Sequence, residues 1–354
     1  MFENAARTKT RPVHVGEVTI GGGAPVVVQS MTSTNTVDAA ATLNQVRALA
    51  DAGCDIVRVS VPSRAALKSF RTICAESPVP IVADIHFDHR LALGAIEAGA
   101  AKLRINPGNI GSWEKVDAVI DAAGEAGIAI RIGVNAGSLE DDIAQNENLT
   151  LLQKLVASSL RFVEHFEGRG FENIVLSAKA HDVPTTIATY RALSRELPQV
   201  PLHLGVTEAG TVRQGTIKSA VGLGALLADG IGDTLRVSLT ANPVEEPPVA
   251  WGILECLGLR RRGPELVSCP TCGRTQVDLI PIAEEVERRL KGVTKPISVA
   301  VMGCVVNGPG EAAGADVGVA CGRGCGLIFR HGEVLRKVSE DAIIDELMRE
   351  IETL

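Results

Sequence analysis

Aromatic residues and surplus basic charge are both scarce in this sequence of 354 residues. Phe, Trp and Tyr make up 3% of the chain, and 35 Lys and Arg stand against 42 Asp and Glu, which gives a net charge of -7. Nucleic-acid-binding surfaces usually combine basic stripes with aromatic rings on which bases stack. We therefore expect no nucleic-acid partner, and any basic site must be local.

Long apolar runs are also missing. No uninterrupted apolar run reaches the roughly 18 residues of a membrane-spanning helix, and residues 1 to 23 lack the apolar segment of a secretory signal. We therefore expect a cytoplasmic protein with no membrane partner. Its eight cysteines are then expected to be reduced thiols rather than disulfides.

The sequence also lacks nucleotide-binding motifs. No G-x-G-x-x-G follows the first apolar run, and G-x-x-x-x-G-K-[ST] does not occur. From residue 25 onward, β-branched runs instead alternate with helix-like segments, at residues 25–31, 54–61, 80–87, 102–109, 129–137, 173–181, 201–210 and 233–240. Eight β/α units of this kind predict an α/β protein with a closed (β/α)8 barrel of the TIM type.

The pattern changes after residue 240, where a Pro- and Glu-rich stretch begins. We predict a barrel domain over residues 1–242, a linker helix within residues 243–264, and a small mixed α/β domain over residues 265–354. Within the small domain the sequence predicts helices at residues 282–290 and 339–354, a strand at residues 297–303, and β segments at residues 316–320 and 326–334.

Arginines interrupt four of the eight apolar runs. They are Arg58, Arg104, Arg131 and Arg236, each placed late in its run. Barrel strands are covered on both faces, so a buried arginine needs a partner, and barrel enzymes work at the mouth formed by the carboxyl ends of the strands. Each arginine could pair with a helix carboxylate instead. A ring of guanidinium groups at the mouth would repel itself unless it held an anion, and the planar guanidinium matches phosphate oxygens, so we predict a diphosphate ligand.

Further polar residues lie at the same strand ends. Side chains two apart on a strand share a face, so we expect Asp84 with His86, Arg104 with Asn106, Lys179 with His181, and Arg236 with Ser238 to point together. Gln29, Asn135 and Glu208 are further candidates for the same site. The segment Asp84-Ile-His86-Phe-Asp88-His89 also permits a metal ion. This gives the alternative of a metal-dependent hydrolase with a TIM barrel, which the lack of a second histidine pair at a later strand end disfavours.

The small domain carries a cysteine motif: Cys269 and Cys272 form a C-x-x-C pair, and Cys304 follows in MGCVVNGPGE. This spacing fits a structural zinc with Cys321 or Cys325 as the fourth ligand. It fits a three-cysteine iron-sulfur cluster equally well, and spacing alone leaves both interpretations open.

Six motifs together resemble one enzyme family over essentially the full chain. They are VVVQSMTSTNTVD, VADIHFDH, LRINPGN, SCPTCGRT, MGCVVNGPGE and ADVGVA. The sequence resembles the bacterial 4-hydroxy-3-methylbut-2-enyl diphosphate synthases of the non-mevalonate isoprenoid route. This resemblance implies an oxidoreductase with a [4Fe-4S] cluster bound by Cys269, Cys272, Cys304 and, as the fourth ligand, Glu311.

The resemblance also implies a reaction, a site and partners. The reaction is the two-electron reductive opening of 2-C-methyl-D-erythritol 2,4-cyclodiphosphate, with electrons from a flavodoxin or ferredoxin and a homodimer as the working form. The diphosphate is bound at the positions of Arg58, Arg104, Arg131, Asn135, Lys179, Arg236 and Ser238, and Glu208 matches an acid near the reacting carbons. Cys321 and Cys325 depart from the family pattern, and we expect both to be reduced thiols without a role at the cluster.

Overall fold

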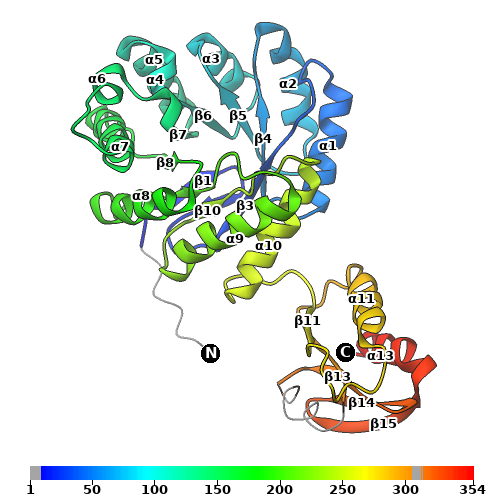
Figure 1. The fold of residues 1–354 in the computed structure, drawn as a ribbon. Coiled ribbons are helices and arrows are strands. Elements are labelled where there is room, and N and C mark those ends of the chain that lie inside the picture. The colour runs from blue at the N-terminus through cyan, green and yellow to red at the C-terminus, as the bar shows by residue number, and fades with distance from the viewer. Residues whose placement is uncertain (1–8, 305–311, 313) are drawn as a thin grey trace. The chain divides into compact units, whose positions relative to one another are not determined.

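The computed structural model describes residues 9–304, 312 and 314–354, and the chain divides into two compact units between Arg260 and Arg261 (Figure 1). The first unit is a (β/α)8 barrel and the second is a smaller mixed α/β unit, which confirms the predicted fold class. No helix in the described part of the chain is long and apolar enough to span a bilayer.

Eight parallel strands form the barrel, in the order β8-β7-β6-β5-β4-β3-β10-β9. A parallel bridge between Leu176 and Leu202 joins the two ends of this order, so the sheet closes. The strands are β3 (Val27–Met31), β4 (Ile56–Ser60), β5 (Ile81–Ile85), β6 (Lys102–Ile105), β7 (Ala129–Asn135), β8 (Ile174–Lys179), β9 (His203–Leu204) and β10 (Thr234–Leu235).

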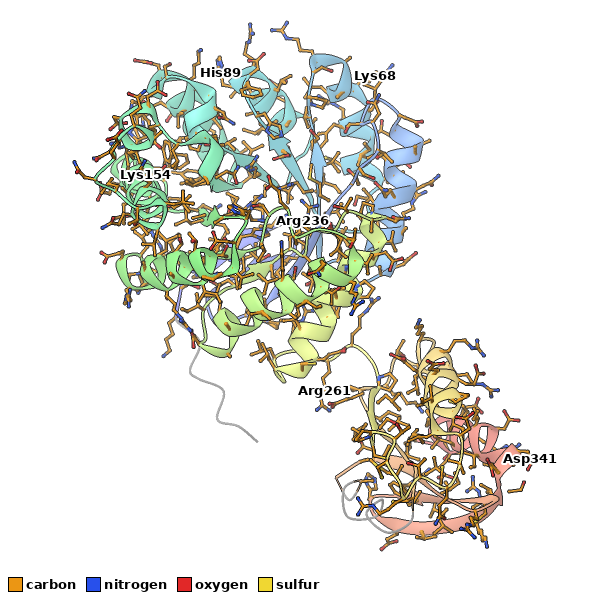
Figure 2. All side chains as sticks on the ribbon, viewed as in Figure 1. Lys68, His89, Lys154, Arg236, Arg261 and Asp341 are labelled. Atoms are coloured by element: carbon orange, nitrogen blue, oxygen red, sulfur yellow. The ribbon has the colours of Figure 1, made fainter. Side chains whose placement is uncertain are left out.

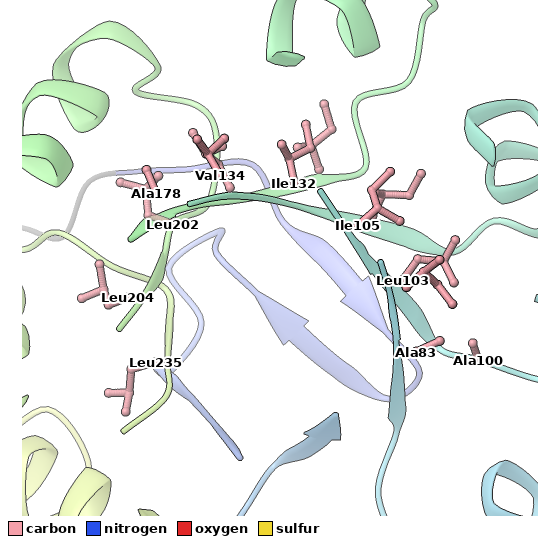
Figure 3. Packing of buried hydrophobic residues seen from close by; sticks show 14 of the residues in the cluster. Ala83, Ala100, Leu103, Ile105, Ile132, Val134, Ala178, Leu202, Leu204 and Leu235 are labelled. Carbon is pink, nitrogen blue, oxygen red and sulfur yellow. The ribbon is translucent and has the colours of Figure 1, made fainter. Parts of the chain in front are cut away.

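Helices surround the barrel because each strand turns an apolar face outward. Leu103 and Ile105 of β6 point toward the helix layer, and Ile132, Val134, Leu204 and Leu235 do the same on other strands (Figure 3). The helices are α1 (Ala39–Asp51), α2 (Arg64–Glu76), α3 (His89–Glu97), α4 (Pro107–Ile110), α5 (Trp113–Ala126), α6 (Asp141–Ala144), α7 (Leu151–Gly168), α8 (Val183–Glu196), α9 (Val212–Ala228) and α10 (Glu246–Cys256).

The alternating residues of the same strands point inward, and many of them are polar. Lys102 and Arg104 alternate with Leu103 and Ile105 on β6, and both are buried. A core of branched apolar side chains fills most barrels of this type. In this barrel, polar and charged side chains instead fill the part of the interior nearer the mouth. Such buried groups need hydrogen-bond or charge partners.

A short antiparallel hairpin closes the bottom of the barrel. Strands β1 (Val13–Val15) and β2 (Val18–Ile20) pair in register, with Val13 opposite Ile20. Apolar side chains of this hairpin pack against inward-facing residues at the start of the barrel strands: Val27, Ile56, Val82, Ala129 and Val175. This apolar cluster separates the polar interior from solvent at the end opposite to the mouth.

The second unit contains a five-stranded mixed sheet in the order β11-β12-β13-β14-β15, with α11 (Leu279–Leu290) and α13 (Ile343–Glu352) packed on one face. The strands are β11 (Glu265–Ser268), β12 (Ser298–Met302), β13 (Val317–Gly322), β14 (Cys325–Arg330) and β15 (Glu333–Ser339). β11, β12 and β13 run parallel, so the loops that follow β11 and β12 leave the same edge of the sheet.

One predicted segment of this unit differs from the observed structure. Residues 326–334 were expected to form a single β segment, but they span the hairpin between β14 and β15. His331 and Gly332 form its turn, with φ of 48° and 82°, in the left-handed region that hairpin turns favour. Asn-Gly is the usual signal for such a turn, and His-Gly is a weaker one.

Candidate functional site

Five cationic side chains surround a cavity at the mouth of the barrel. The cavity has a volume of about 230 Å³, and its cations are Arg58, Arg104, Arg131, Lys179 and Arg236. Figure 2 shows Arg236 at the centre of the barrel unit, whereas Lys68, His89 and Lys154 lie at its rim. Asp84 is the only carboxylate among the residues that line the cavity, so the site carries a marked excess of positive charge.

Asp84 holds two of these arginines in place. Arg104 donates to its Oδ1 over 3.2 Å, Arg58 Nε lies 3.9 Å from its Oδ2, and His86 Nε2 lies 3.1 Å from the same oxygen. Burial alone would raise the pKa of Asp84, but Arg58, His86 and Arg104 together hold it below its usual range. Asp84 is therefore ionised at neutral pH and orients the guanidinium groups.

Glu246 performs the same task for Arg236. Its two carboxylate oxygens accept from Arg236 Nε and Nη2, each over 3.2 Å, in a bidentate arrangement. The same carboxylate accepts from the Ser30 hydroxyl at 2.6 Å and from the Leu239 backbone N–H at 3.1 Å. Glu246 is buried at the start of α10, so this helix fixes the position of Arg236, the residue that follows β10.

Two glycines make room for the cations. A Cβ added at Gly133 would lie 2.7 Å from Arg104 Nε, and one added at Gly205 would lie 2.5 Å from Lys179 Nζ. Both positions face inward near the carboxyl ends of their strands. A larger residue at either position would displace a charged group from the cavity.

Burial affects the protonation of the site. It lowers the pKa of Arg58 to about 10, with Arg236 and Arg104 adding to the effect against the attraction of Asp84. It also lowers the pKa of Lys179 well below its usual value, and Arg131, Arg58, Arg236 and Arg104 reinforce this shift. An anion in the cavity would reverse both effects, because it favours the charged form of each group.

The sequence predicted most of the residues that line this cavity. Arg58, Asp84, His86, Arg104, Arg131, Asn135, Lys179, Arg236 and Ser238 all lie there, as expected. His181 lies on the exposed turn after β8 and does not line the cavity, and Asn106 instead caps α4 by accepting from the Gly108 N–H at 3.1 Å. The role assigned to each lining residue is a prediction about binding.

Glu208 lies beside the cavity rather than in its wall. Thr207 lines the cavity, and the next residue, Glu208, is exposed and has a φ of 54°. A non-glycine residue in the left-handed region costs about 1 kcal/mol or more, and such residues occur in turns and cluster at active and ligand-binding sites. This backbone conformation directs the side chain of Glu208 differently from that of an ordinary strand residue.

Several residues of the site had no role in the sequence analysis. Arg131 Nη1 donates to Ser177 Oγ at 3.0 Å, and Arg58 Nε and Nη2 lie 3.0 and 2.8 Å from Met31 Sδ. Glu246 was placed in the segment that joins the two predicted domains. Ser177 could have been found, because it lies two residues before Lys179 and therefore shares its face.

The metal site considered for Asp84, His86, Asp88 and His89 does not form. Asp84 is engaged by arginines, and Asp88 caps α3 and accepts from Arg90 Nε at 2.9 Å. The described residues contain no group of three His, Cys, Asp or Glu side chains arranged to hold a metal ion. The structure therefore gives the metal-dependent hydrolase no site at this position.

The predicted cluster ligands lie at one edge of the second unit's sheet. Cys269 follows β11 and Cys304 follows β12, its parallel neighbour, with Ser268 opposite Val301. The Gly303 N–H donates to Cys269 Sγ at 3.1 Å, and hydrogen bonds from Arg274 lower the pKa of Cys272. The lowered pKa favours the thiolate form of Cys272, which is the form that binds iron, and hydrogen bonds to sulfur are common at iron-sulfur clusters, so these residues fit such a cluster, although their thiols are not gathered into one group. Glu311 lies outside the described residues.

Cys321 and Cys325 are free thiols in the β13–β14 hairpin. Cys321 pairs with Gly326 and Cys325 pairs with Gly322, so the two cysteines occupy neighbouring registers. Successive residues of a strand point to opposite faces, which places the two thiols on opposite sides of the sheet. This geometry does not suit a disulfide between them.

Comparison with known proteins identifies the family. Residues 10–251 match the GcpE TIM-barrel domain, and residues 265–353 match the GcpE protein C-terminal domain. A Geobacter sulfurreducens protein named 4-hydroxy-3-methylbut-2-en-1-yl diphosphate synthase (flavodoxin) is 56% identical over 348 residues, 98% of each chain. A Bacillus velezensis protein of the same name is 52% identical over 354 residues, which cover 100% of this chain and 94% of the relative. The chain belongs to the GcpE family.

Proposed function

We propose that this protein is a 4-hydroxy-3-methylbut-2-en-1-yl diphosphate synthase, an iron-sulfur oxidoreductase of isoprenoid biosynthesis. Its substrate is 2-C-methyl-D-erythritol 2,4-cyclodiphosphate, which is reduced by two electrons while one hydroxyl group leaves as water. The observation that carries this proposal is the cavity of about 230 Å³ that five cations and one carboxylate line at the barrel mouth. Such a cavity suits a small ligand with several negative charges.

The cations also favour the reaction itself. Opening the ring breaks a carbon–oxygen bond to the diphosphate, and the released oxygen gains negative charge. Arg58 and Arg104 are held in place by Asp84, and Arg236 is held by Glu246. Preorganised donors of this kind stabilise charge that develops in the transition state more than they stabilise the substrate.

Glu208 is proposed as the acid that delivers the proton to the departing hydroxyl group. It follows Thr207, which lines the cavity, and it is one of two non-glycine residues in the described chain with a left-handed backbone conformation. Asn135 and Ser238 line the same cavity and are proposed to bind diphosphate oxygens. His181 was predicted as a further ligand, and its exposed position outside the cavity wall favours a smaller role.

A [4Fe-4S] cluster bound by Cys269, Cys272, Cys304 and Glu311 would supply the electrons. The hydrogen bond from the Gly303 N–H to Cys269 Sγ, 3.1 Å long, is of the kind that cluster-bound sulfurs accept and supports Cys269 as a ligand. We further propose a flavodoxin or ferredoxin as the electron donor, since flavodoxin appears in the names of the relatives. A homodimer is proposed from the family resemblance, and light scattering of the purified protein tests it.

Anaerobic purification followed by a reductase assay tests the proposed function. We expect a brown protein with broad visible absorption and about four irons per chain. With reduced flavodoxin it should convert the cyclic diphosphate into the linear alkenyl diphosphate. A colourless protein with stoichiometric zinc that hydrolyses the substrate without a reductant would support the hydrolase alternative instead.

A further inference from the structure

Unpartnered polar side chains fill the barrel interior below the cavity. Gln29, Lys102 and His203 extend from β3, β6 and β9, and each is at most 1% exposed. Lys102 Nζ, His203 Nε2 and both amide atoms of Gln29 lack hydrogen-bond partners among the described residues. Buried polar groups in proteins are nearly always hydrogen-bonded, so these atoms require partners, which are either ordered water or a bound ligand.

This group lies below the proposed diphosphate site. Lys102 precedes Arg104 by two residues on β6, which places it about 7 Å closer to the bottom of the barrel. Arg104 lines the cavity, whereas Gln29, Lys102 and His203 do not. Lys102 therefore lies outside the wall of the cavity that we propose for the diphosphate.

Among the described residues of the barrel, the buried carboxylates Asp84, Asp233 and Glu246 all have other partners. Asp233 accepts from Thr10 Oγ1 and from the Leu202 N–H, each at 3.0 Å. Asp84 is engaged by Arg104, Arg58 and His86, and Glu246 is engaged by Arg236. Burial lowers the pKa of Lys102, and the charges of Arg131 and Arg58 lower it further. These effects favour the neutral amine, whereas an anion beside Lys102 favours the charged ammonium form.

His203 adds a further hydrogen-bond donor to those of Gln29 and Lys102. Burial lowers the pKa of His203, and Arg131, Lys179 and Lys102 lower it further, so the ring is neutral. Its Nδ1 lies 3.4 Å from Thr234 Oγ1, which leaves Nε2 directed elsewhere. If Thr234 donates to Nδ1, Nε2 carries the proton and donates as well.

We propose that the interior of the barrel binds one small inorganic anion, of the size of chloride, between Lys102, Gln29 and His203. The ammonium group, the Gln29 amide N–H and the His203 N–H supply donors, and the Gln29 amide oxygen is the single acceptor among these atoms. A water molecule would need acceptors for its own protons, which this set supplies poorly. The site is separate from the proposed function and does not depend on it.

Halide binding can be measured directly on the wild-type holoprotein. Crystals soaked in bromide should show an anomalous scattering peak within hydrogen-bond distance of Lys102 Nζ. In solution, replacing gluconate by chloride at constant ionic strength should raise the melting temperature by a few degrees, because a ligand bound only by the folded state stabilises it.

Two matched variants separate this site from surface effects. Lys102→Met removes the ammonium group, so the dependence of the melting temperature on chloride should disappear. Lys68→Met removes an exposed lysine at the rim of the barrel unit and should keep the wild-type dependence (Figure 2). The absence of a bromide peak in wild-type crystals, or an unchanged chloride dependence in a folded Lys102→Met protein, would overturn the proposal.

Discussion

Gly205 shows how a single missing side chain positions a charge at the cavity. A Cβ at this position would lie 2.5 Å from Lys179 Nζ and 3.1 Å from the backbone oxygen of Arg236, so Gly205→Ala must displace the ammonium group. We expect Gly205→Ala to weaken binding of the cyclic diphosphate by about ten- to a hundredfold, the value of one charged hydrogen bond or slightly more. Isothermal titration calorimetry with the substrate measures this change.

Gly224→Ala is the matched control for this prediction. A Cβ at Gly224, on α9, meets no atom within 4 Å, so substrate affinity should stay at the wild-type value. Equal affinities in the two variants would show that Lys179 does not contact the ligand.

The lowered pKa of Lys179 leads to a prediction of how the affinity for the substrate depends on pH. Burial and four arginines hold its pKa well below the usual 10.5, so the free protein loses this proton at a lower pH than an exposed lysine does. A bound diphosphate favours the charged form, so binding above the lowered pKa takes up a proton. Affinity should then fall as the pH rises, by at most about tenfold per pH unit for one linked proton.

Calorimetry in two buffers with different ionisation enthalpies measures the proton uptake. Wild-type protein should take up a proton on binding at alkaline pH, and Lys179→Met should not. Binding without proton uptake in the wild-type protein would mean that Lys179 is already charged in the free cavity.

Glu311 is the residue for which the chemistry gives the sharpest expectation. A thiolate is a good iron ligand but leaves iron less readily than a carboxylate oxygen, so Glu311→Cys should keep near-normal iron content and lose most turnover. Iron content and reductase activity are measured on the same anaerobic sample. The double variant Cys321→Ala, Cys325→Ala serves as the control and should keep both. Near wild-type turnover in Glu311→Cys would contradict a role for a labile ligand.

At the scale of the element, α10 contributes to the site through its first residue. Glu246→Gln replaces a carboxylate that binds Arg236 through two hydrogen bonds of 3.2 Å. We expect the free energy of unfolding to fall by about 1 to 3 kcal/mol and substrate affinity to fall with it, because Arg236 is no longer fixed. Denaturant titration and calorimetry on the same variant measure the two effects.

An exposed ion pair between helices provides the comparison. Asp229→Asn removes the partner of Arg191, at 2.7 Å, where both side chains are largely exposed. Such pairs contribute about 0 to 1 kcal/mol, so neither stability nor affinity should change much. If Glu246→Gln behaved like Asp229→Asn, Arg236 would not depend on α10 for its position.

The sequence predicted the barrel because its strands are covered on both faces and read as apolar runs, which Arg58, Arg104, Arg131 and Arg236 interrupt. Lys102 could have been included, since it lies two residues before Arg104 and shares its inward face. The contact of Glu246 with Arg236 could not have been predicted from the sequence. The two oxygens of Glu246 reach the arginine only because the chain turns between β10 and α10. The spacing of Cys269, Cys272 and Cys304 allowed zinc and iron equally, and the resemblance decided between them.

At the scale of the whole molecule, the proposed binding and redox functions belong to different units. The cavity that we propose for the diphosphate is lined only by residues before Arg260, and the proposed cysteine ligands lie after Arg261. Arg131→Ala should therefore weaken substrate binding by about ten- to a hundredfold and leave the visible absorption of the iron-sulfur protein unchanged. Cys272→Ser should have the opposite effect: it should weaken the visible absorption and leave substrate binding unchanged. Loss of absorption in Arg131→Ala would show that the units depend on each other for folding.

The hairpin at the bottom of the barrel determines where ligands can enter and leave. Val13, Val15 and Ile20 pack with inward-facing residues of the barrel strands, so the described structure offers no passage through that end. Substrate must enter and product must leave through the same mouth, one after the other. A product molecule that stays bound at the mouth therefore delays the next turnover. Because the cavity has a single opening, we expect product inhibition that is competitive with substrate.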